Sequence, residues 1–269
     1  LQGSRTHLLG VLVTDISNGF FAGLAKQIEI AARERGYSIL LFNSDYNPEN
    51  EQKYLDVVRR YRVDGILAVP IRETSAEWHD YVKKLDAPVV TITRHATGLD
   101  SFYVDHVQAG AQVAQHLVDR GYRRFLFVGK DYDSKCTGFR QRLTELGFGS
   151  VTTNRVLKTE DQLRRELADW YTGDTARPAI FAGNDIYALQ VLDILRELGV
   201  SVPEQAGVIG FDDTFMGRYL NPRLSTVSQP VSAMAREAVN WLLDRIEHPG
   251  ERPAMERAFP ATLVPREST

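Results

Sequence analysis

The feature that most limits what this chain can fold into is a regular alternation of apolar and amphipathic segments over its first half. The apolar segments are short and almost uninterrupted: HLLGVLV (7–13), YSILLF (37–42), GILAVP (65–70) and PVVTIT (88–93). Strands that are apolar on both sides, joined by amphipathic helices, are typical of a parallel sheet covered by helices on both faces. The sequence therefore predicts an α/β fold of doubly wound parallel sheets.

Helical periodicity fills the gaps between these strands. Phe20, Leu24 and Ile28 lie on one helical face, and Gly36 ends that helix. Pro48 is suited to the first turn of a second helix, which we expect to run to about residue 61. A third helix is expected over about 75–85.

The pattern then restarts, which predicts a second lobe. We expect helices at about 107–120, 138–146 and 185–198, and strands at 124–128, 152–156, 179–183 and 206–211. A last helix, 231–247, stands between the extended pieces STVSQ and ERAFPATLVPRE. We interpret it as a return to the first lobe, so that 6–104 plus 230–257 form one lobe and 105–229 plus 258–269 the other, joined by three crossover strands.

Composition excludes several classes of protein. The hydrophobic fraction of 43%, the charged fraction of 25% and the mean hydropathy of -0.27 are ordinary for a soluble protein. No apolar run approaches the roughly 18 residues of a membrane span, and LQGSRTHLL has no signal-peptide pattern, so a cytoplasmic location is expected. A net charge of -3 gives no overall attraction to nucleic acid, and we expect no membrane partner.

The candidate site residues are those that directly follow the strands, because parallel α/β sheets bind ligands at the carboxyl ends of their strands. Most are charged or hydrogen-bonding groups: 14–21, Arg94, Asp105, Ser134, Lys135, Asn184, Asp185, Asp212 and Asp213. Such side chains supply the donors and acceptors that sugar hydroxyl groups need. Asn184 and Asp185 have the alternative role of capping the helix that they begin, whereas Asp212 is followed by no evident helix.

Two adjacent aromatic residues interrupt the first of these polar loops. One interpretation is that Asn18 caps the helix and that both rings pack in the core. The other is that only Phe20 is core, while Phe21, about 100° away on the helix, offers a flat apolar surface to a sugar ring.

Neither catalysis nor metal binding is predicted. Asp212 and Asp213 are adjacent, so their side chains diverge on an extended segment, and no nucleophile, phosphate-loop or dinucleotide motif is present. The single Cys136 is more typical of a small buried hydrophobic residue than of a nucleophile. No CxxC or HExxH pattern occurs, and we expect no metal and no cofactor.

Several segments, taken in order, resemble the effector-binding core of the LacI/GalR family of bacterial transcriptional regulators. They include RTHLLGVLVTDISNGFFAGLAKQIEIAARERGYSILLFNSD, RVDGILAVP, PVVTITR, VDHVQAG, FAGNDIYALQVLDILRELGVSVPEQAGVIGFDD, YLNPRLSTVSQP and LVPREST. The resemblance implies a periplasmic-binding-protein-like fold of type I, with two lobes and three crossovers. It also identifies 1–5 as the remnant of a hinge that joins a helix-turn-helix headpiece to this core.

The resemblance also implies a ligand pocket in the cleft between the lobes. Carried over by position, its residues are Asn18, Phe21, Arg94, Asp105, Lys135, Asn184, Asp212 and Gln229. Lys135 departs from the family pattern, which has Arg before the Gly138-Phe139 pair, and lysine lacks the planar two-pronged donor of arginine.

The function that follows is the ligand-sensing core of a homodimeric repressor. A small-molecule effector, a sugar or a sugar derivative, would bias DNA binding, and operator DNA would be contacted only through the headpiece. The chief alternative is a periplasmic sugar-binding protein of a transport system, which shares this fold. An enzyme on a similar scaffold and a regulator that answers to a protein partner are further alternatives.

Overall fold

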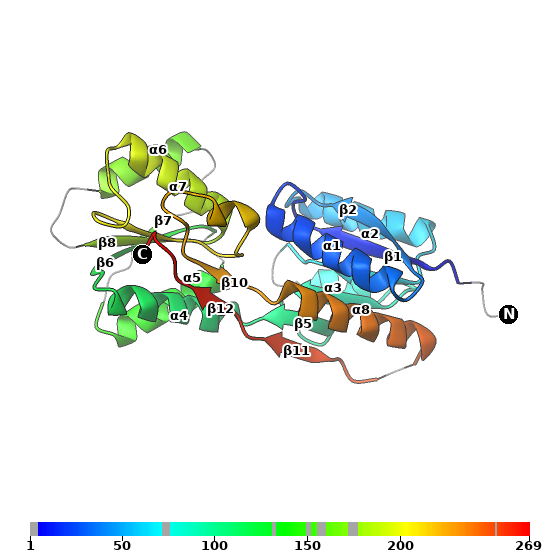
Figure 1. The fold of residues 1–269 in the computed structure, drawn as a ribbon. Helices are drawn as coiled ribbons and strands as arrows, with labels where there is room; N and C mark the ends of the chain where they lie inside the picture. The colour runs from blue at the N-terminus through cyan, green and yellow to red at the C-terminus, as the bar shows by residue number, and fades with distance from the viewer. Residues whose placement is uncertain are drawn as a thin grey trace. The chain divides into compact units, whose positions relative to one another are not determined.

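The computed structural model describes residues 5–71, 76–130, 133–148, 152–154, 160–171, 177–250 and 252–269. The chain forms two compact units, drawn in Figure 1. The first comprises Leu1–Val104 with Pro230–Phe259, and the second comprises Asp105–Gln229 with Pro260–Thr269. Of the expected hinge remnant 1–5, only Arg5 lies among the described residues.

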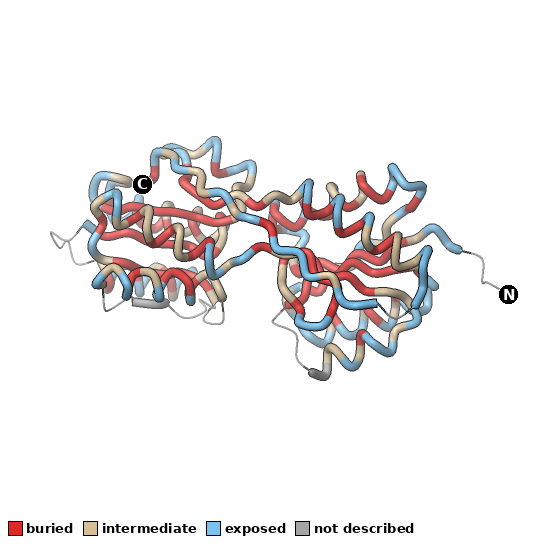
Figure 2. The backbone as a smooth tube through the Cα atoms, turned by 90° about the horizontal axis from the view of Figure 1, so that it is seen from below, coloured by how far each residue is buried: buried red, intermediate tan, exposed pale blue. Residues whose placement is uncertain are grey.

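The first unit is built on a six-stranded sheet in the order β11-β5-β4-β3-β1-β2, and every pair in it is parallel. Its strands are β1 (Leu8–Val13), β2 (Ser38–Asn43), β3 (Gly65–Ala68), β4 (Val89–Thr93), β5 (Asp100–Val104) and β11 (Glu256–Phe259). All residues of β3 and β4 are buried, as the uninterrupted apolar runs predict. Figure 2 shows these strands as buried lines between partly exposed helices.

Helices cover both faces of this sheet. They are α1 (Gly19–Arg33), α2 (Pro48–Arg60), α3 (Ala76–Val82) and α8 (Val231–Glu247). Ile66 of β3 packs in a cluster with Leu55 of α2 and Val82 of α3. Its neighbour Gly65 faces Leu242 of α8 instead, because successive strand residues point to opposite faces. α1 and α8 pack against each other within the first unit (Figure 1).

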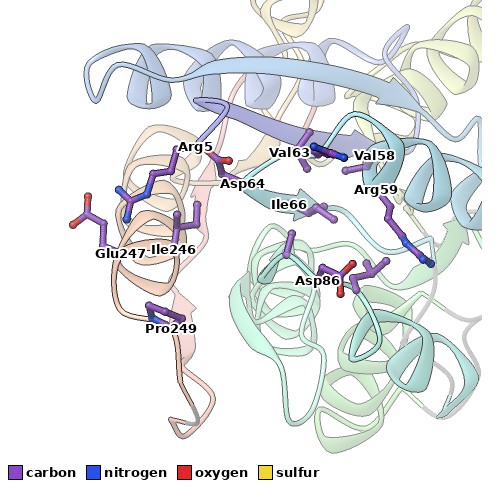
Figure 3. Close-up of a pocket in the computed structure, with 13 residues that line it drawn as sticks. Arg5, Val58, Arg59, Val63, Asp64, Ile66, Asp86, Ile246, Glu247 and Pro249 are labelled. Atoms are coloured by element: carbon purple, nitrogen blue, oxygen red, sulfur yellow. The ribbon is translucent and has the colours of Figure 1, made fainter. Parts of the chain in front are cut away.

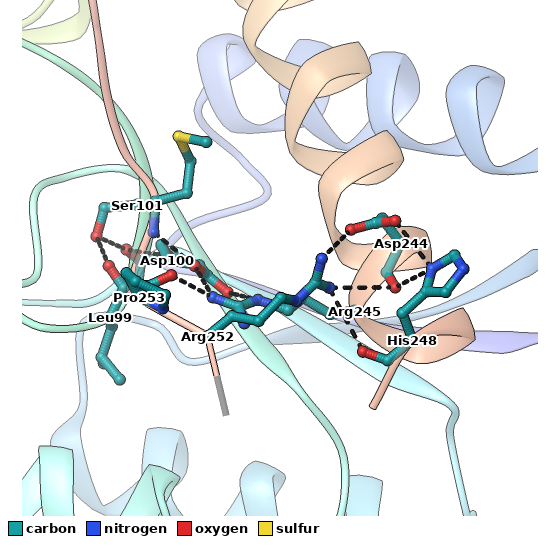
Figure 4. A network of polar contacts seen from close by, with 10 residues as sticks. Leu99, Asp100, Ser101, Asp244, Arg245, His248, Arg252 and Pro253 are labelled. Atoms are coloured by element: carbon teal, nitrogen blue, oxygen red, sulfur yellow. Dashed lines mark hydrogen bonds and ion pairs between the residues drawn. The ribbon is translucent and has the colours of Figure 1, made fainter. Parts of the chain in front are cut away.

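A buried ion pair fixes the end of α8 to the sheet (Figure 4). Arg245 donates through Nε and Nη2 to the two carboxylate oxygens of Asp100, the first residue of β5, each at 2.8 Å. Asp100 also accepts the backbone N–H of Met255 at 2.7 Å, and Arg245 donates to the Pro253 carbonyl at 2.8 Å. Both charges are hydrogen-bonded on several sides, which offsets the cost of burying them. The segment that leads into β11 is thereby held against the start of β5.

The second unit contains a parallel four-stranded sheet in the order β7-β6-β8-β9 and an antiparallel pair, β10-β12. The strands are β6 (Arg124–Val128), β7 (Thr152–Asn154), β8 (Pro178–Ala182), β9 (Gly207–Ile209), β10 (Thr226–Ser228) and β12 (Thr262–Val264). The helices are α4 (His106–Asp119), α5 (Ser134–Glu145), α6 (Glu160–Trp170), α7 (Asp185–Glu197) and the 3₁₀ turn η1 (Phe215–Arg218).

Helices α4 and α5 approach each other unusually closely. A Cβ atom on Gly110 of α4 would lie 2.0 Å from the Lys135 carbonyl oxygen. A Cβ atom on Gly138 of α5 would lie 1.8 Å from the Val107 carbonyl oxygen. Glycine is therefore required on both helices, and the contact fixes the first turn of α5 beside the first turn of α4.

The structure differs from the sequence-based expectation in three places. α5 begins at Ser134 and not at about 138, because the Asp133 side chain caps it by accepting the Lys135 N–H at 3.1 Å. α6 was not expected, although Leu163, Leu167 and Trp170 are spaced for one buried helical face. The first unit extends to Phe259, beyond 257, since Phe259 still pairs with Val104. The end of the weak strand expected at 152–156 lies outside the described residues.

Candidate functional site

The polar residues expected to bind a ligand lie at the carboxyl ends of the strands in both units. In the second unit, three of them form one cluster: Lys135 at the start of α5, Asp212 beyond β9, and Gln229 beyond β10. Gln229 donates from Nε2 to Asp212 Oδ1 at 2.8 Å. The Lys135 ammonium lies 4.4 Å from the centre of the Phe211 ring, next to Asp212 in the chain.

Asp212 is held in a backbone conformation that favours glycine. Its φ is 107°, and that of Asp213 is 49°. Its N–H donates to the Val227 carbonyl at 2.8 Å, which ties the turn to β10. Burial raises the pKa of the Asp212 carboxyl to about 8, the nearby Asp185 carboxylate adds to that rise, and the Lys135 charge opposes it. At neutral pH the group is therefore largely protonated, so it can donate a hydrogen bond as well as accept one.

Lys135 does not present a free positive charge. Its Nζ pairs with Asp133 Oδ2 at 3.3 Å, and both side chains are mostly buried. The same ammonium lies over the Phe211 ring. Lys135 is thus a fixed donor whose charge is already balanced, which suits an uncharged hydroxyl better than an anion.

Gln229 has an unused acceptor. The residue is 8% exposed, and its Oε1 has no hydrogen-bond partner among the described residues, while Nε2 is occupied by Asp212. A buried amide oxygen without a partner costs about 1–3 kcal/mol. A ligand hydroxyl that donated to Oε1 would remove this cost.

The other two predicted residues of the second unit are helix caps. Asn184 Oδ1 accepts the Tyr187 N–H at 2.8 Å at the start of α7. Asp105 Oδ1 accepts the Gln108 N–H at 2.9 Å at the start of α4. Asp185 is not a cap, because its carboxylate binds Thr214 and Thr226 instead.

In the first unit the predicted residues lie at the same edge of one sheet, Asn18 and Phe21 beyond β1 and Arg94 beyond β4. Asn18 caps α1 by accepting the Phe20 N–H at 3.0 Å. Phe21 is only 7% exposed, and its ring packs edge-to-face on Phe20 with centroids 5.1 Å apart. The structure therefore buries both rings. The alternative in which Phe21 stands open as a flat surface is not what this structure displays.

Arg94 is held by the loop that follows β3. Its Nη1 donates to the Ile71 carbonyl at 3.0 Å, and the Ile71 N–H donates to the buried Glu51 carboxylate at 3.1 Å. Burial raises the Glu51 pKa, whereas the Ile71 N–H and the Arg94 charge lower it. Near Asn18, the buried Thr14 hydroxyl has no partner among the described residues.

Sequence reasoning missed two charged residues near this cluster, one that binds Lys135 and one that binds Asp213, the neighbour of Asp212 in the chain. Asp133, the partner of Lys135, could have been found from the Asp-Ser-Lys sequence at a helix start. Arg266 binds Asp213 at 2.5 Å, and 53 residues of sequence separate the two, so no local pattern signals this pair.

A cavity of about 820 Å³ lies elsewhere in the first unit (Figure 3). Its walls include the apolar residues Val58, Ile66 and Ile246 and the charged residues Arg59 and Asp64. Asp64 directly precedes β3, so the cavity lies at the amino ends of the strands, and none of the predicted site residues lines it.

Within the described parts of the chain, no three His, Cys, Asp or Glu side chains are grouped to hold a metal ion. No described helix has the length and apolarity of a membrane span.

Comparison with known proteins links this arrangement to a family. The model of the periplasmic binding protein-like domain family matches residues 114–269. The HTH-type transcriptional regulator DegA of Bacillus subtilis (strain 168) is 32% identical over all of this chain and 82% of its own length.

Solved structures agree. A periplasmic binding protein/LacI transcriptional regulator from Alkaliphilus metalliredigens QYMF, complexed with D-xylulofuranose, has a TM-score of 0.85 and 28% identity, covering 98% of this chain and 99% of its own. A LacI family transcriptional regulator from Enterococcus faecium with bound ribose has a TM-score of 0.83 and 26% identity, covering 97% of this chain and 98% of its own.

Proposed function

We propose, from the premise that this chain belongs to the LacI/GalR family of transcriptional regulators, that its ligand is a sugar held by the polar loops at the strand ends. The chain is the ligand-sensing regulatory core of such a regulator and is not an enzyme. Family membership favours this function over the alternative of a binding protein that serves a transporter.

The observation that carries the proposal is the Asp212–Gln229 pair. A sugar hydroxyl both donates and accepts hydrogen bonds. Gln229 Oε1 is a buried acceptor without a partner, and the largely protonated Asp212 carboxyl is a potential donor beside it. A hydroxyl placed here would donate to Gln229 Oε1, which has no partner among the described residues.

Two solved relatives with bound sugars support this ligand class. We propose contacts from eight residues: Asn18, Phe21, Arg94, Asp105, Lys135, Asn184, Asp212 and Gln229. Because Phe21 is 7% exposed and packs on Phe20, its contact would be made only by the exposed part of its ring and not by an open face. That the residues of both units act on one ligand is part of the proposal. Three or four hydrogen bonds that involve charged groups, at roughly 1.5–3 kcal/mol each, are sufficient for micromolar affinity after ordering costs.

In this proposal the sugar acts by shifting the population of two conformations of a homodimer. A coupling free energy of about 1–3 kcal/mol would change operator affinity roughly 5- to 150-fold. Operator DNA would be contacted by a helix-turn-helix headpiece on the amino-terminal side, and the protein would act in the cytoplasm.

The test is isothermal titration and thermal unfolding with D-ribose, D-xylulose, D-glucose and sucrose as probes. At least one sugar should raise the melting temperature by several degrees, since 1 kcal/mol corresponds to roughly 2–4 °C in a protein of this size. Asp212→Ala and Gln229→Leu should remove the shift, while Glu204→Gln, an exposed acid of the same unit, should retain it. No shift with any sugar, or an unchanged shift in Asp212→Ala, would contradict the proposal.

A further inference from the structure

The turn that carries Asp212 is strained, and something must hold it in place. Two consecutive residues other than glycine, Asp212 and Asp213, have positive φ angles of 107° and 49°. Such residues cost on the order of 1–3 kcal/mol each and persist only where their surroundings fix them. The surroundings of this turn therefore determine where the Asp212 carboxylate points.

Asp185 binds the turn on both sides of Asp212. Its backbone N–H donates to the Phe211 carbonyl at 2.8 Å. Its Oδ2 accepts the Thr214 N–H at 2.6 Å and the Thr214 hydroxyl at 2.8 Å. One residue thus holds the positions immediately before and two residues after Asp212.

The same carboxylate joins the turn to β10. Its Oδ1 accepts the Thr226 hydroxyl at 2.7 Å, and Thr226 Oγ1 in turn accepts the Asp213 N–H at 3.3 Å. Asp185 is 1% exposed, and a Cβ atom on Gly210 would lie 2.3 Å from its Oδ1, so the turn closes tightly around it. β10 leads directly to Gln229, the partner of Asp212.

We propose that Asp185 is the positioning residue that aims the Asp212 carboxyl at Gln229 and so determines ligand affinity without touching the ligand. The inference rests on the proposed function of Asp212. Arg266 cannot replace it, because Arg266 binds the Asp213 carboxylate and the Leu224 carbonyl but forms no hydrogen bond with Phe211 or Thr214 among the described residues.

The decisive variant is Asp185→Asn. Three donors converge on the Asp185 carboxylate, and in asparagine one carboxylate oxygen is replaced by an NH₂ group. On the Thr214 side this group would face an N–H that can only donate. On the Thr226 side the hydroxyl would have to turn and accept, although the same oxygen already accepts the Asp213 N–H. The turn should then relax toward ordinary φ values and move the Asp212 side chain away from Gln229. Asp193→Asn is the matched control, since Asp193 lies on the same helix but forms an exposed pair with Arg196.

Two measurements need no ligand. In a crystal structure of Asp185→Asn, the distance from Asp212 Oδ1 to Gln229 Nε2 should exceed about 3.5 Å, the limit of a hydrogen bond. Hydrogen exchange of the Thr214 amide should be at least about tenfold faster than in the parent chain, because a tenfold change corresponds to loss of one such bond. An intact Asp212–Gln229 bond with unchanged φ at Asp212 would overturn the inference.

The third measurement uses D-ribose as the probe, at a temperature well below the melting temperature of each variant. Asp185→Asn should raise the Kd for D-ribose at least about tenfold, and Asp193→Asn should leave it unchanged. An unchanged Kd in Asp185→Asn would also overturn the inference.

If the parent chain does not bind D-ribose, the proposal for that sugar fails by itself, and the two measurements made without ligand decide the role of Asp185. If Asp185→Asn does not fold, two milder variants should show the same changes at smaller size. Thr214→Val removes one hydrogen bond to Asp185, and Thr226→Val removes one hydrogen bond to Asp185 together with the acceptor of the Asp213 N–H.

Discussion

At the scale of single residues, Asp212 makes stability depend on pH in a predictable direction. Its folded-state pKa of about 8 lies above its ordinary value of 3.8, so between these pH values the folded chain keeps a proton that the unfolded chain releases. The contribution of this group to stability is therefore greatest at low pH and falls as the pH rises toward 8. In Asp212→Asn the side chain does not titrate, so stability does not fall for this reason as the pH rises.

We therefore expect Asp212→Asn to gain stability relative to the parent chain as the pH rises from 5 to 8. The relative gain should be on the order of 1 kcal/mol or more, or about 2–4 °C in melting temperature. Thermal unfolding of both proteins at four pH values measures it, and Glu204→Gln serves as a charge-loss control. A difference between Asp212→Asn and parent that stays constant with pH would show that the carboxyl titrates normally.

The sequence could indicate Asp212 as a site residue, because it follows a strand and begins no helix. It could not indicate the positive φ or the raised pKa. Asp185 and Val227 hold the turn, and burial together with the Asp185 carboxylate raises the pKa of Asp212, and only the fold creates these surroundings. Lys135 illustrates the same limit. In the structure its ammonium group pairs with Asp133 and lies over the Phe211 ring, so its charge is not available to a ligand. The sequence shows only that Lys135 stands where the family pattern has Arg, and does not show these contacts.

At the scale of elements, the contact between α4 and α5 is the one most sensitive to a single methyl group. Gly110→Ala would place a Cβ atom 2.0 Å from a backbone oxygen of α5, and a backbone atom cannot rotate away. We expect a loss of about 1–3 kcal/mol or more in unfolding free energy, measured by urea denaturation. A loss below about 0.5 kcal/mol would mean that the helices separate easily.

Gly23→Ala is the matched comparison. Gly23 also lies inside a helix, α1, but nothing stands within 4 Å of an added Cβ atom. Here alanine should stabilise the chain by roughly 0.5–1 kcal/mol, because glycine is the poorer helix former. If the unfolding free energy falls in Gly110→Ala and rises in Gly23→Ala, the loss in Gly110→Ala comes from packing and not from helix propensity.

Element types were largely predictable because apolar runs and helical periodicity are strong signals in a parallel α/β chain. α8 lies where the spacing placed it, at Val231–Glu247. The start of α5 was misplaced because the cap at Asp133 precedes the apolar periodicity, which begins only near Phe139. α6 was overlooked because its apolar face consists of only three buried residues in a mostly charged segment.

At the scale of the whole molecule, the balanced charge predicts weak contact with nucleic acid. The 269 residues carry 32 basic and 35 acidic side chains, so few phosphate charges could be neutralised. We expect this chain to bind double-stranded DNA with a Kd weaker than about 1 µM at physiological salt, as measured by mobility shift. Sub-micromolar binding would show that the core itself contacts DNA.

Because β11 pairs with β5, the sheet of the first unit is completed only late in synthesis of the chain. β5 ends at Val104, but its outer partner is made only when the ribosome reaches Glu256–Phe259. Until then, β5 has an open edge, which is a template for wrong pairing with other chains. The nascent chain must carry this exposed edge while some 150 further residues are translated, about 10–30 s at ordinary rates. Premature termination before β11 would thus release a species prone to aggregation, even though most of the second unit had already emerged.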